Sequence, residues 1–195
     1  VNALVRPLAG SLTDNEIRAL AGVALPELFA CWGGADGNRR PYPADHELAR
    51  LAVLADQPIG LDVTAEPAIH WLGDQLRYRD ADRLAQQAVA CLDQHQIEVP
   101  FSLLRVAGEA CVQVGETPAA RGYYQRALAR LDDLLAQGQV PDTEDHAYLL
   151  VAHGRLLIQD GYPNEALGFF EQAQQLLSTD PRFQREHSIV LSDIA

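Results

Sequence analysis

The stretch GEACVQVGETPAARGYYQRA, residues 108–127, decides the fold of this chain. A second stretch, GRLLIQDGYPNEALGFFEQA at residues 154–173, places small and aromatic residues at the same offsets, 46 positions later. The shared order is Gly, Gly, Ala, aromatic, Ala, given by Gly108, Gly115, Ala120, Tyr124 and Ala127 and again by Gly154, Gly161, Ala166, Phe170 and Ala173. Self-similarity over such a period is typical of stacked helical repeats. We therefore expect an all-α chain.

Each position of this pattern has a role in a pair of antiparallel helices. The first Gly and the first Ala let the two helix backbones approach closely, and the middle Gly makes the turn between them. The aromatic side chain fills the space behind the small residues. A weaker copy begins 35 positions before the first and supplies Gly73 and Ala85, but Val89 stands where the aromatic residue is expected.

The pattern and the turn signals predict the organisation of the chain. The expected helical pairs are 67–78 with 81–95, 100–114 with 117–137, and 143–159 with 163–177, followed by a lone helix at 181–195. These pairs define repeat units of about 66–99, 100–142 and 143–180. Residues 1–65 do not match the repeat, but short helices are expected at 13–21, 26–32 and 45–55. This segment is interpreted as a cap, a degenerate repeat or the end of a preceding domain.

These residues resemble the tetratricopeptide repeat (TPR) family. The small residues Gly108, Ala120 and Ala127, the turn residue Gly115 and the aromatic Tyr124 match that family's pattern, and the copy from Gly154 to Ala173 matches equally well. The resemblance covers residues 66–195 and implies a right-handed α-solenoid of antiparallel helix pairs. A period of 46 residues, against about 34 in the ordinary repeat, is similar to the extended repeats of kinesin light chains and of bacterial STAND-type regulators.

The resemblance also implies where a partner binds. In the TPR family the first helix of each pair lines a concave groove. The corresponding residues here are His70, Asp74, Arg77, Ser102, Arg105, Glu109, Gln113, Tyr148, Arg155 and Gln159. Arginine and tyrosine are frequent interface hot spots. Arg105 and Arg155 are expected to be exposed, so that their replacement by alanine weakens binding and leaves stability nearly unchanged.

Composition excludes several classes of partner. The formal net charge is −12 with a pI near 4.8, so the surface repels phosphate backbones and nucleic acid is not an expected partner. No stretch approaches the roughly 20 apolar residues of a membrane span, and no secretory signal is visible. We expect a cytoplasmic protein without a membrane contact. Because the chain starts at Val1 and contains no methionine, it is interpreted as a piece of a longer protein.

The sequence predicts no metal, no cofactor and no catalytic site. Cys31, Cys91 and Cys111 are far apart and form no C-x-x-C pair, so they are interpreted as buried free thiols. No phosphate-binding glycine motif or nucleophile elbow occurs. His153 is expected to be packed in the core. An enzymatic alternative would need groups such as His70, Asp74 and His153 to converge, which helical spacing alone does not bring about.

The function predicted from these observations is a non-catalytic scaffold that binds a protein, a peptide or another part of its own chain. Its sharper form is the sensor or regulatory region of a larger bacterial multidomain protein. The alternatives are self-association through the incomplete terminal repeat or, less favoured, a helical enzyme domain.

Overall fold

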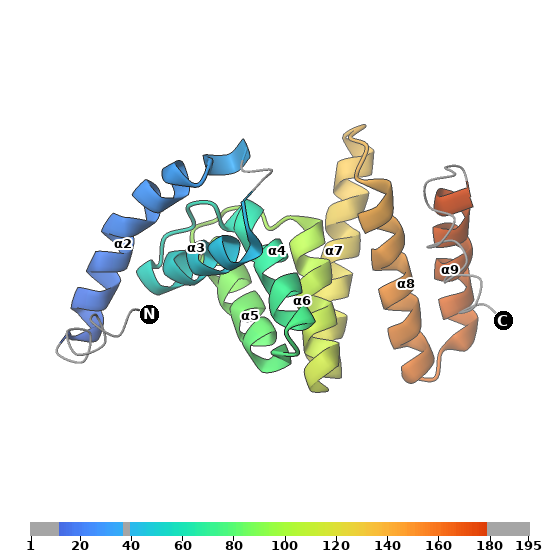
Figure 1. Cartoon of the computed structure of the whole chain (residues 1–195). Coiled ribbons are helices and arrows are strands. Elements are labelled where there is room, and N and C mark those ends of the chain that lie inside the picture. Colours follow the sequence, from blue (N-terminus) through green and yellow to red (C-terminus); the bar gives the residue numbers. More distant parts are fainter. Residues whose placement is uncertain (1–11, 37–39, 179–195) are drawn as a thin grey trace. The chain divides into compact units, whose positions relative to one another are not determined.

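The computed structural model describes residues 12–36 and 40–178, and all regular structure in this part of the chain is helical (Figure 1). The α-helices are α2 (Asp14–Cys31), α3 (Tyr42–Ala55), α4 (Leu61–Asp74), α5 (Tyr78–Gln94), α6 (Phe101–Val114), α7 (Thr117–Ala136), α8 (Thr143–Gln159) and α9 (Pro163–Ser178), with a short 3-10 helix, η1, at Gly34–Asp36. The all-α prediction is confirmed for these residues. The helix predicted at 181–195 lies outside them.

None of the described helices is both long enough and apolar enough to cross a membrane. The chain divides into two compact units, residues 1–99 and residues 100–195. Residues 65 and 66, between which the repeat region was predicted to begin, both lie within helix α4.

The first unit begins with a helix that is longer than the sequence predicted. Thr13 and Glu16 form the expected capping box, in which the Glu16 carboxylate accepts a hydrogen bond from the Thr13 amide at 2.8 Å. However, α2 runs unbroken through Pro26, so the prediction of two short helices here is wrong. Proline removes one backbone hydrogen bond, but Ala21 and Leu25 beside it are buried and α2 packs against α3, which stabilises the helix.

Three further helix starts in this unit differ from the prediction, and one of them is that of α5, which begins at Tyr78 rather than at residue 81. Helix α3 begins at Tyr42 after Pro41, and Asp45 is not its cap but a buried residue that accepts a hydrogen bond from Arg40. Helix α4 begins at Leu61, six residues before the predicted start, and continues through Pro67. Within this unit α3 packs against α2, α4 and α5.

The second unit follows the prediction closely. Helices α6, α7, α8 and α9 begin and end within one residue of the predicted bounds. They lie side by side in chain order, with alternating direction (Figure 1). Each helix packs against the next, and α6 also packs against α8. Ala120, Ala127, Ala166 and Ala173 are fully buried in these contacts.

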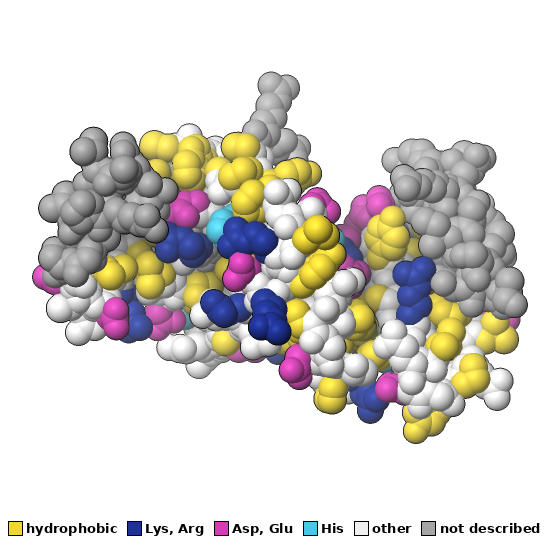
Figure 2. Space-filling model, turned by 60° about the horizontal axis from the view of Figure 1, so that its bottom comes forward, with side chains coloured by type: hydrophobic (Ala, Val, Ile, Leu, Met, Phe, Trp, Pro, Cys, Tyr) yellow, Lys and Arg dark blue, Asp and Glu magenta, His cyan; other side chains and the backbone are white. Residues whose placement is uncertain are grey.

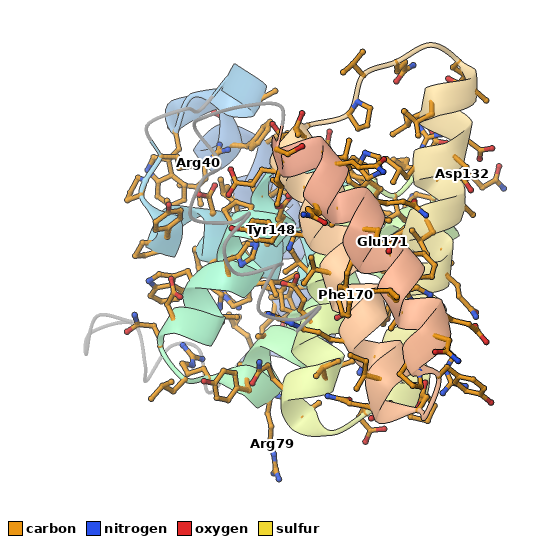
Figure 3. All side chains as sticks on the ribbon, turned by 90° about the vertical axis from the view of Figure 1, so that its right-hand side faces the viewer. Arg40, Arg79, Asp132, Tyr148, Phe170 and Glu171 are labelled. Atoms are coloured by element: carbon orange, nitrogen blue, oxygen red, sulfur yellow. The ribbon has the colours of Figure 1, made fainter. Side chains whose placement is uncertain are left out.

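Each of the two clear copies of the pattern places a glycine opposite an aromatic ring. A Cβ atom added to Gly108 would lie 2.3 Å from Cε1 of Tyr124, and one added to Gly154 would lie 2.6 Å from Cε1 of Phe170. Both rings are at most 2% exposed, and Figure 3 shows Phe170 on the α9 helix. The first glycine of the pattern therefore makes room for the partner helix's ring, rather than for its backbone as expected.

Six helices, α3 to α8, end in the same turn. At the end of α6, for example, the Gly115 amide donates to Val112 and the Glu116 amide donates to Cys111, which is a Schellman motif. The residue with positive φ in each turn is Asp56, Leu76, Gln96, Gly115, Gly138 or Gly161. The turns of the second unit therefore use glycine, whereas those of the first unit place other residues in the left-handed conformation.

This turn corrects the alignment of the weak copy. Leu76 corresponds to Gly115, an offset of 39 residues rather than the 35 predicted. Gly73 then lies before the turn, where an added Cβ atom would meet nothing within 4 Å. Ala85 takes the place of the aromatic Tyr124, and Ile69 takes the place of Gly108. Ile69 and Ala85 are both buried. In this pair the large side chain is on the first helix and the small one on the second, the reverse of Gly108 and Tyr124.

Leu76 offers a test of this turn. Its φ is +58° and its side chain is 73% exposed, so it carries left-handed backbone strain without buried contacts to offset it. We expect Leu76→Gly to raise the free energy of unfolding by about 0.5–1 kcal/mol, since relief of roughly 1–2 kcal/mol of strain exceeds the entropy that glycine adds to the unfolded chain. Urea unfolding measures the change. Leu76→Ala keeps the strain and should give no gain; equal stability of the two variants would contradict the assignment.

Candidate functional site

The second unit carries a hollow of about 280 Å³ between α6 and α8. It is lined by Glu109, Val112 and Gln113 of α6, by Tyr124 of α7, and by Tyr148, Val151, Ala152, Arg155, Leu156 and Gln159 of α8. The spacing of three and four residues on α6 and on α8 places these side chains on one face of each helix. We call this hollow the α6–α8 groove.

The groove gathers most of the partner-binding residues predicted for this unit. Glu109, Gln113, Tyr148, Arg155 and Gln159 all line it. These five residues come from two helices that are separated in sequence by the whole of α7. The predicted residues Ser102 and Arg105 do not line the groove.

Arg105 differs from the prediction because it is buried. Its side chain is 5% exposed and donates hydrogen bonds to Glu109 at 2.7 Å and to Asp145 at 2.8 Å. The guanidinium carbon also lies 5.8 Å from the centre of the Tyr148 ring, within the range of a cation–π interaction. Arg105 therefore links α6 to α8 through a buried ion pair with Asp145, and it is not an exposed contact residue.

The groove combines an apolar floor with a polar rim. Val151, Leu156 and Tyr124 are buried, whereas Gln113, Arg155 and Gln159 are exposed. Burial and the nearby Glu109 carboxylate raise the pKa of Tyr124 far above its ordinary value, so this phenol stays neutral. Arg105 forms ion pairs with both Glu109 and Asp145. The lining also contains the exposed side chain of Arg155.

Two of the three residues predicted in the first unit, His70 and Asp74, lie at a different hollow. Its volume is about 250 Å³, and its lining consists of Tyr42, Glu66, Pro67, His70, Trp71 and Asp74. His70 and Asp74, which are four residues apart on α4, both line it. Arg77 does not line this hollow and instead donates to the Asp80 carboxylate at 2.8 Å.

His153 is packed in the core, as the sequence predicted. It is 8% exposed, and its ring meets Phe169 edge-on, with 4.7 Å between the ring centres. Burial, helped by the charge of Arg121, lowers the pKa of His153. A neutral, enclosed imidazole with aromatic neighbours is a packing residue, and it does not line the groove.

The cysteines differ in exposure from the prediction. Cys91 and Cys111 are buried free thiols, but Cys31 is exposed. Cys91 also belongs to a cluster that the sequence did not indicate. Asp56, Cys91 and His95 each place one potential metal-ligating atom within 4.8 Å of the others. Asp56 precedes Cys91 by 35 residues, so only the packing of α3 against α5 reveals the cluster.

The charged surface is mixed in sign on the face drawn in Figure 2, where basic side chains are interspersed with acidic and hydrophobic ones. Every basic side chain of the sequence other than histidine is an arginine. Arginine binds carboxylates with two parallel hydrogen bonds, a geometry that lysine cannot provide. An arginine at the groove can therefore bind a carboxylate through two parallel hydrogen bonds.

No protein-family model matches this chain, and no curated protein matches it in sequence.

Proposed function

We propose that this chain is a non-catalytic protein-interaction module of the TPR type, built as a right-handed α-solenoid, and that the α6–α8 groove binds a peptide segment of a partner protein. The observation that carries the proposal is the convergence of Glu109, Gln113, Tyr148, Arg155 and Gln159 on one hollow. The repeat pattern in the sequence predicted these residues as partner-binding. They lie on α6 and α8, which pack against each other.

The size and chemistry of the groove support a peptide as the occupant. About 280 Å³ is at the lower limit of the ~300–1,000 Å³ that small-molecule sites occupy. Such a hollow accepts a few side chains of a peptide that continues along the surface. The apolar floor favours an aliphatic or aromatic side chain, and the exposed Arg155 favours a carboxylate beside it. We therefore propose a segment in which an apolar residue stands next to an acidic one.

The wider role that we propose is that of a sensor or regulatory region within a larger bacterial multidomain protein in the cytoplasm. The support is the 46-residue spacing of the two clear copies and its similarity to extended repeats of that class. The acidic net charge of −12 favours protein over nucleic-acid partners.

A peptide selection tests the groove directly. A random peptide library displayed on phage is enriched on the immobilised chain, and the enriched peptides are then measured by fluorescence anisotropy. We expect apolar–acidic peptides, and we expect Arg155→Ala to weaken their binding at least tenfold, about 1.4 kcal/mol, as the loss of an interface arginine does.

The matched control is Arg126→Ala, which removes an exposed arginine from α7 outside the groove lining. This variant should bind the peptides as the unchanged chain does. Peptides that bind equally well to Arg155→Ala, or a selection that enriches no peptide, would contradict the proposed role of the groove.

A further inference from the structure

Asp56, Cys91 and His95 are brought together by two helix ends in the first unit. Asp56 is the residue with positive φ, +55°, in the turn that follows α3. Cys91 lies in the last turn of α5, and His95 follows at the end of that helix. Residues four apart on a helix lie on the same face, so the thiol and the imidazole both face the Asp56 carboxylate.

The distances approach those of a tetrahedral metal site. Cys91 Sγ lies 3.9 Å from Asp56 Oδ1, and His95 Nε2 lies 3.4 Å from the same oxygen. Zinc bond lengths of about 2.3 Å to sulfur and about 2.0–2.1 Å to nitrogen and oxygen put tetrahedral ligands roughly 3.3–3.6 Å apart. The two distances to Asp56 Oδ1 are therefore within a few tenths of an ångström of those values. The third distance, between Cys91 Sγ and His95 Nε2, is at most 4.8 Å, so these two atoms close on the ion as it binds.

A neighbouring side chain orients the carboxylate. Gln94 Nε2 donates to Asp56 Oδ2 at 3.2 Å, which leaves Oδ1 directed at Cys91 and His95. Hydrogen bonds of this kind position the ligands of metal sites. The side chains of Asp56 and His95 are 41% and 36% exposed, so an ion can reach the cluster from solvent while the sulfur is buried beneath.

Without an ion the cluster is held by hydrogen bonds. The Cys91 thiol donates weakly to Asp56 Oδ1, and His95 Nε2 lies 3.0 Å from the Asp56 backbone oxygen. Burial and the adjacent carboxylate raise the pKa of Cys91. A metal ion must therefore displace the thiol proton, which is released to solvent as the metal–sulfur bond forms. His95 binds the ion through the Nε2 lone pair, in the neutral tautomer that carries its proton on Nδ1.

We propose that Asp56, Cys91 and His95 bind one Zn²⁺ ion, with water as the fourth ligand. A thiolate and an imidazole favour zinc over magnesium or calcium, which prefer oxygen ligands alone. Because Asp56 follows α3 and the other two ligands belong to the end of α5, the ion joins these two helices. The site lies entirely within residues 1–99, and it does not depend on the peptide groove.

The first test is metal binding to the whole, reduced chain. Zinc is measured in competition with a fluorescent chelator, and cobalt is used as a spectroscopic probe because a cobalt–thiolate bond gives a charge-transfer absorption. We expect one ion per chain, a cobalt–thiolate band, and a higher melting temperature when zinc is added.

Two pairs of matched variants identify the ligands. Cys91→Ser should abolish the cobalt–thiolate band, whereas Cys31→Ser, which changes an exposed thiol elsewhere, should keep it. His95→Gln should weaken zinc binding at least tenfold, whereas His70→Gln, which changes an exposed histidine outside the cluster, should not. The His95 side chain is 36% exposed and lies at the end of α5, so its variant is expected to fold, which circular dichroism verifies.

The proposal is overturned if the chain binds no zinc, or if Cys91→Ser and His95→Gln bind zinc as the unchanged chain does. Loss of the cobalt–thiolate band in Cys31→Ser would assign the thiolate ligand to the exposed cysteine and overturn it as well. If the α6–α8 groove bound no peptide, the zinc measurements would be unaffected, because the groove and the zinc site share no residue.

Discussion

Tyr124→Ala is expected to lower the free energy of unfolding by about 3–5 kcal/mol, as measured by thermal or urea unfolding. The Tyr124 ring is 2% exposed and occupies the space above Gly108, where a Cβ atom would lie 2.3 Å from the ring. Glycine cannot extend into the cavity that alanine leaves. The loss therefore combines the transfer of a large apolar ring to water with an unfilled cavity.

The neighbouring residue supplies the control for this prediction. Tyr123→Ala removes the same kind of side chain from a half-buried position on α7, and it should cost clearly less. A melting temperature that falls equally in the two variants would contradict the assigned packing.

A double-mutant cycle isolates the contact between ring and glycine. Gly108→Ala alone should cost about 1–3 kcal/mol through overpacking against the Tyr124 ring. In the Tyr124→Ala background the same change should cost much less, because the ring that it strikes is gone. Additive losses would show that the two residues are not coupled.

Arg105→Ala is expected to lower the free energy of unfolding by about 3 kcal/mol. Removing one member of a buried ion pair costs ~3–5 kcal/mol when the remaining charge stays buried. Here the lower value applies, because the side chains of Glu109 and Asp145 are 35% and 29% exposed and can be partly hydrated. The change also removes the link between α6 and α8, so we expect peptide binding at the groove to weaken with it.

Arg155→Ala is the matched control, since this arginine is exposed on α8. Its effect on stability should stay within about 0.5 kcal/mol, even though peptide binding is weakened at least tenfold. Chemical unfolding of both variants separates the two roles. If Arg105→Ala were as stable as Arg155→Ala, the buried ion pairs would contribute nothing to the fold.

The helices of the second unit could be predicted to within one residue because glycine marks where they end. Gly115 and Gly161 adopt positive φ at the ends of α6 and α8, a conformation that glycine reaches without steric cost. Their 46-residue spacing was therefore visible in the sequence. The alanines and aromatic residues that follow them could be assigned from the same register.

The first unit was misaligned because the same turn is made there by other residues. Asp56, Leu76 and Gln96 take the positive φ, and none of them is recognisable as a helix end from its type. The pairing of large and small side chains is also reversed, with Ile69 and Ala85 in place of Gly108 and Tyr124. The alignment on Gly73 is therefore four residues away from the position, Ile69, that matches Gly108.

The candidate groove was predictable in part. Helical spacing placed Glu109, Gln113, Tyr148, Arg155 and Gln159 on the faces that line it. The same spacing gave Arg105 an exposed position, although it is buried. A charged side chain is buried when opposite charges surround it, and one of its partners, Asp145, lies 40 residues further along the chain.

The sequence by itself determined that the chain is helical, where the helices of the second unit begin and end, and which of its residues are small enough to sit beside a ring. These properties depend on local backbone preference and on spacing within one helix. Only the tertiary structure decided that Arg105 is buried and that Asp56 meets Cys91 and His95. The burial of Arg105 and the cluster of Asp56, Cys91 and His95 both depend on contacts between separate helices. Such contacts are set by how the helices pack and cannot be read from spacing within one helix.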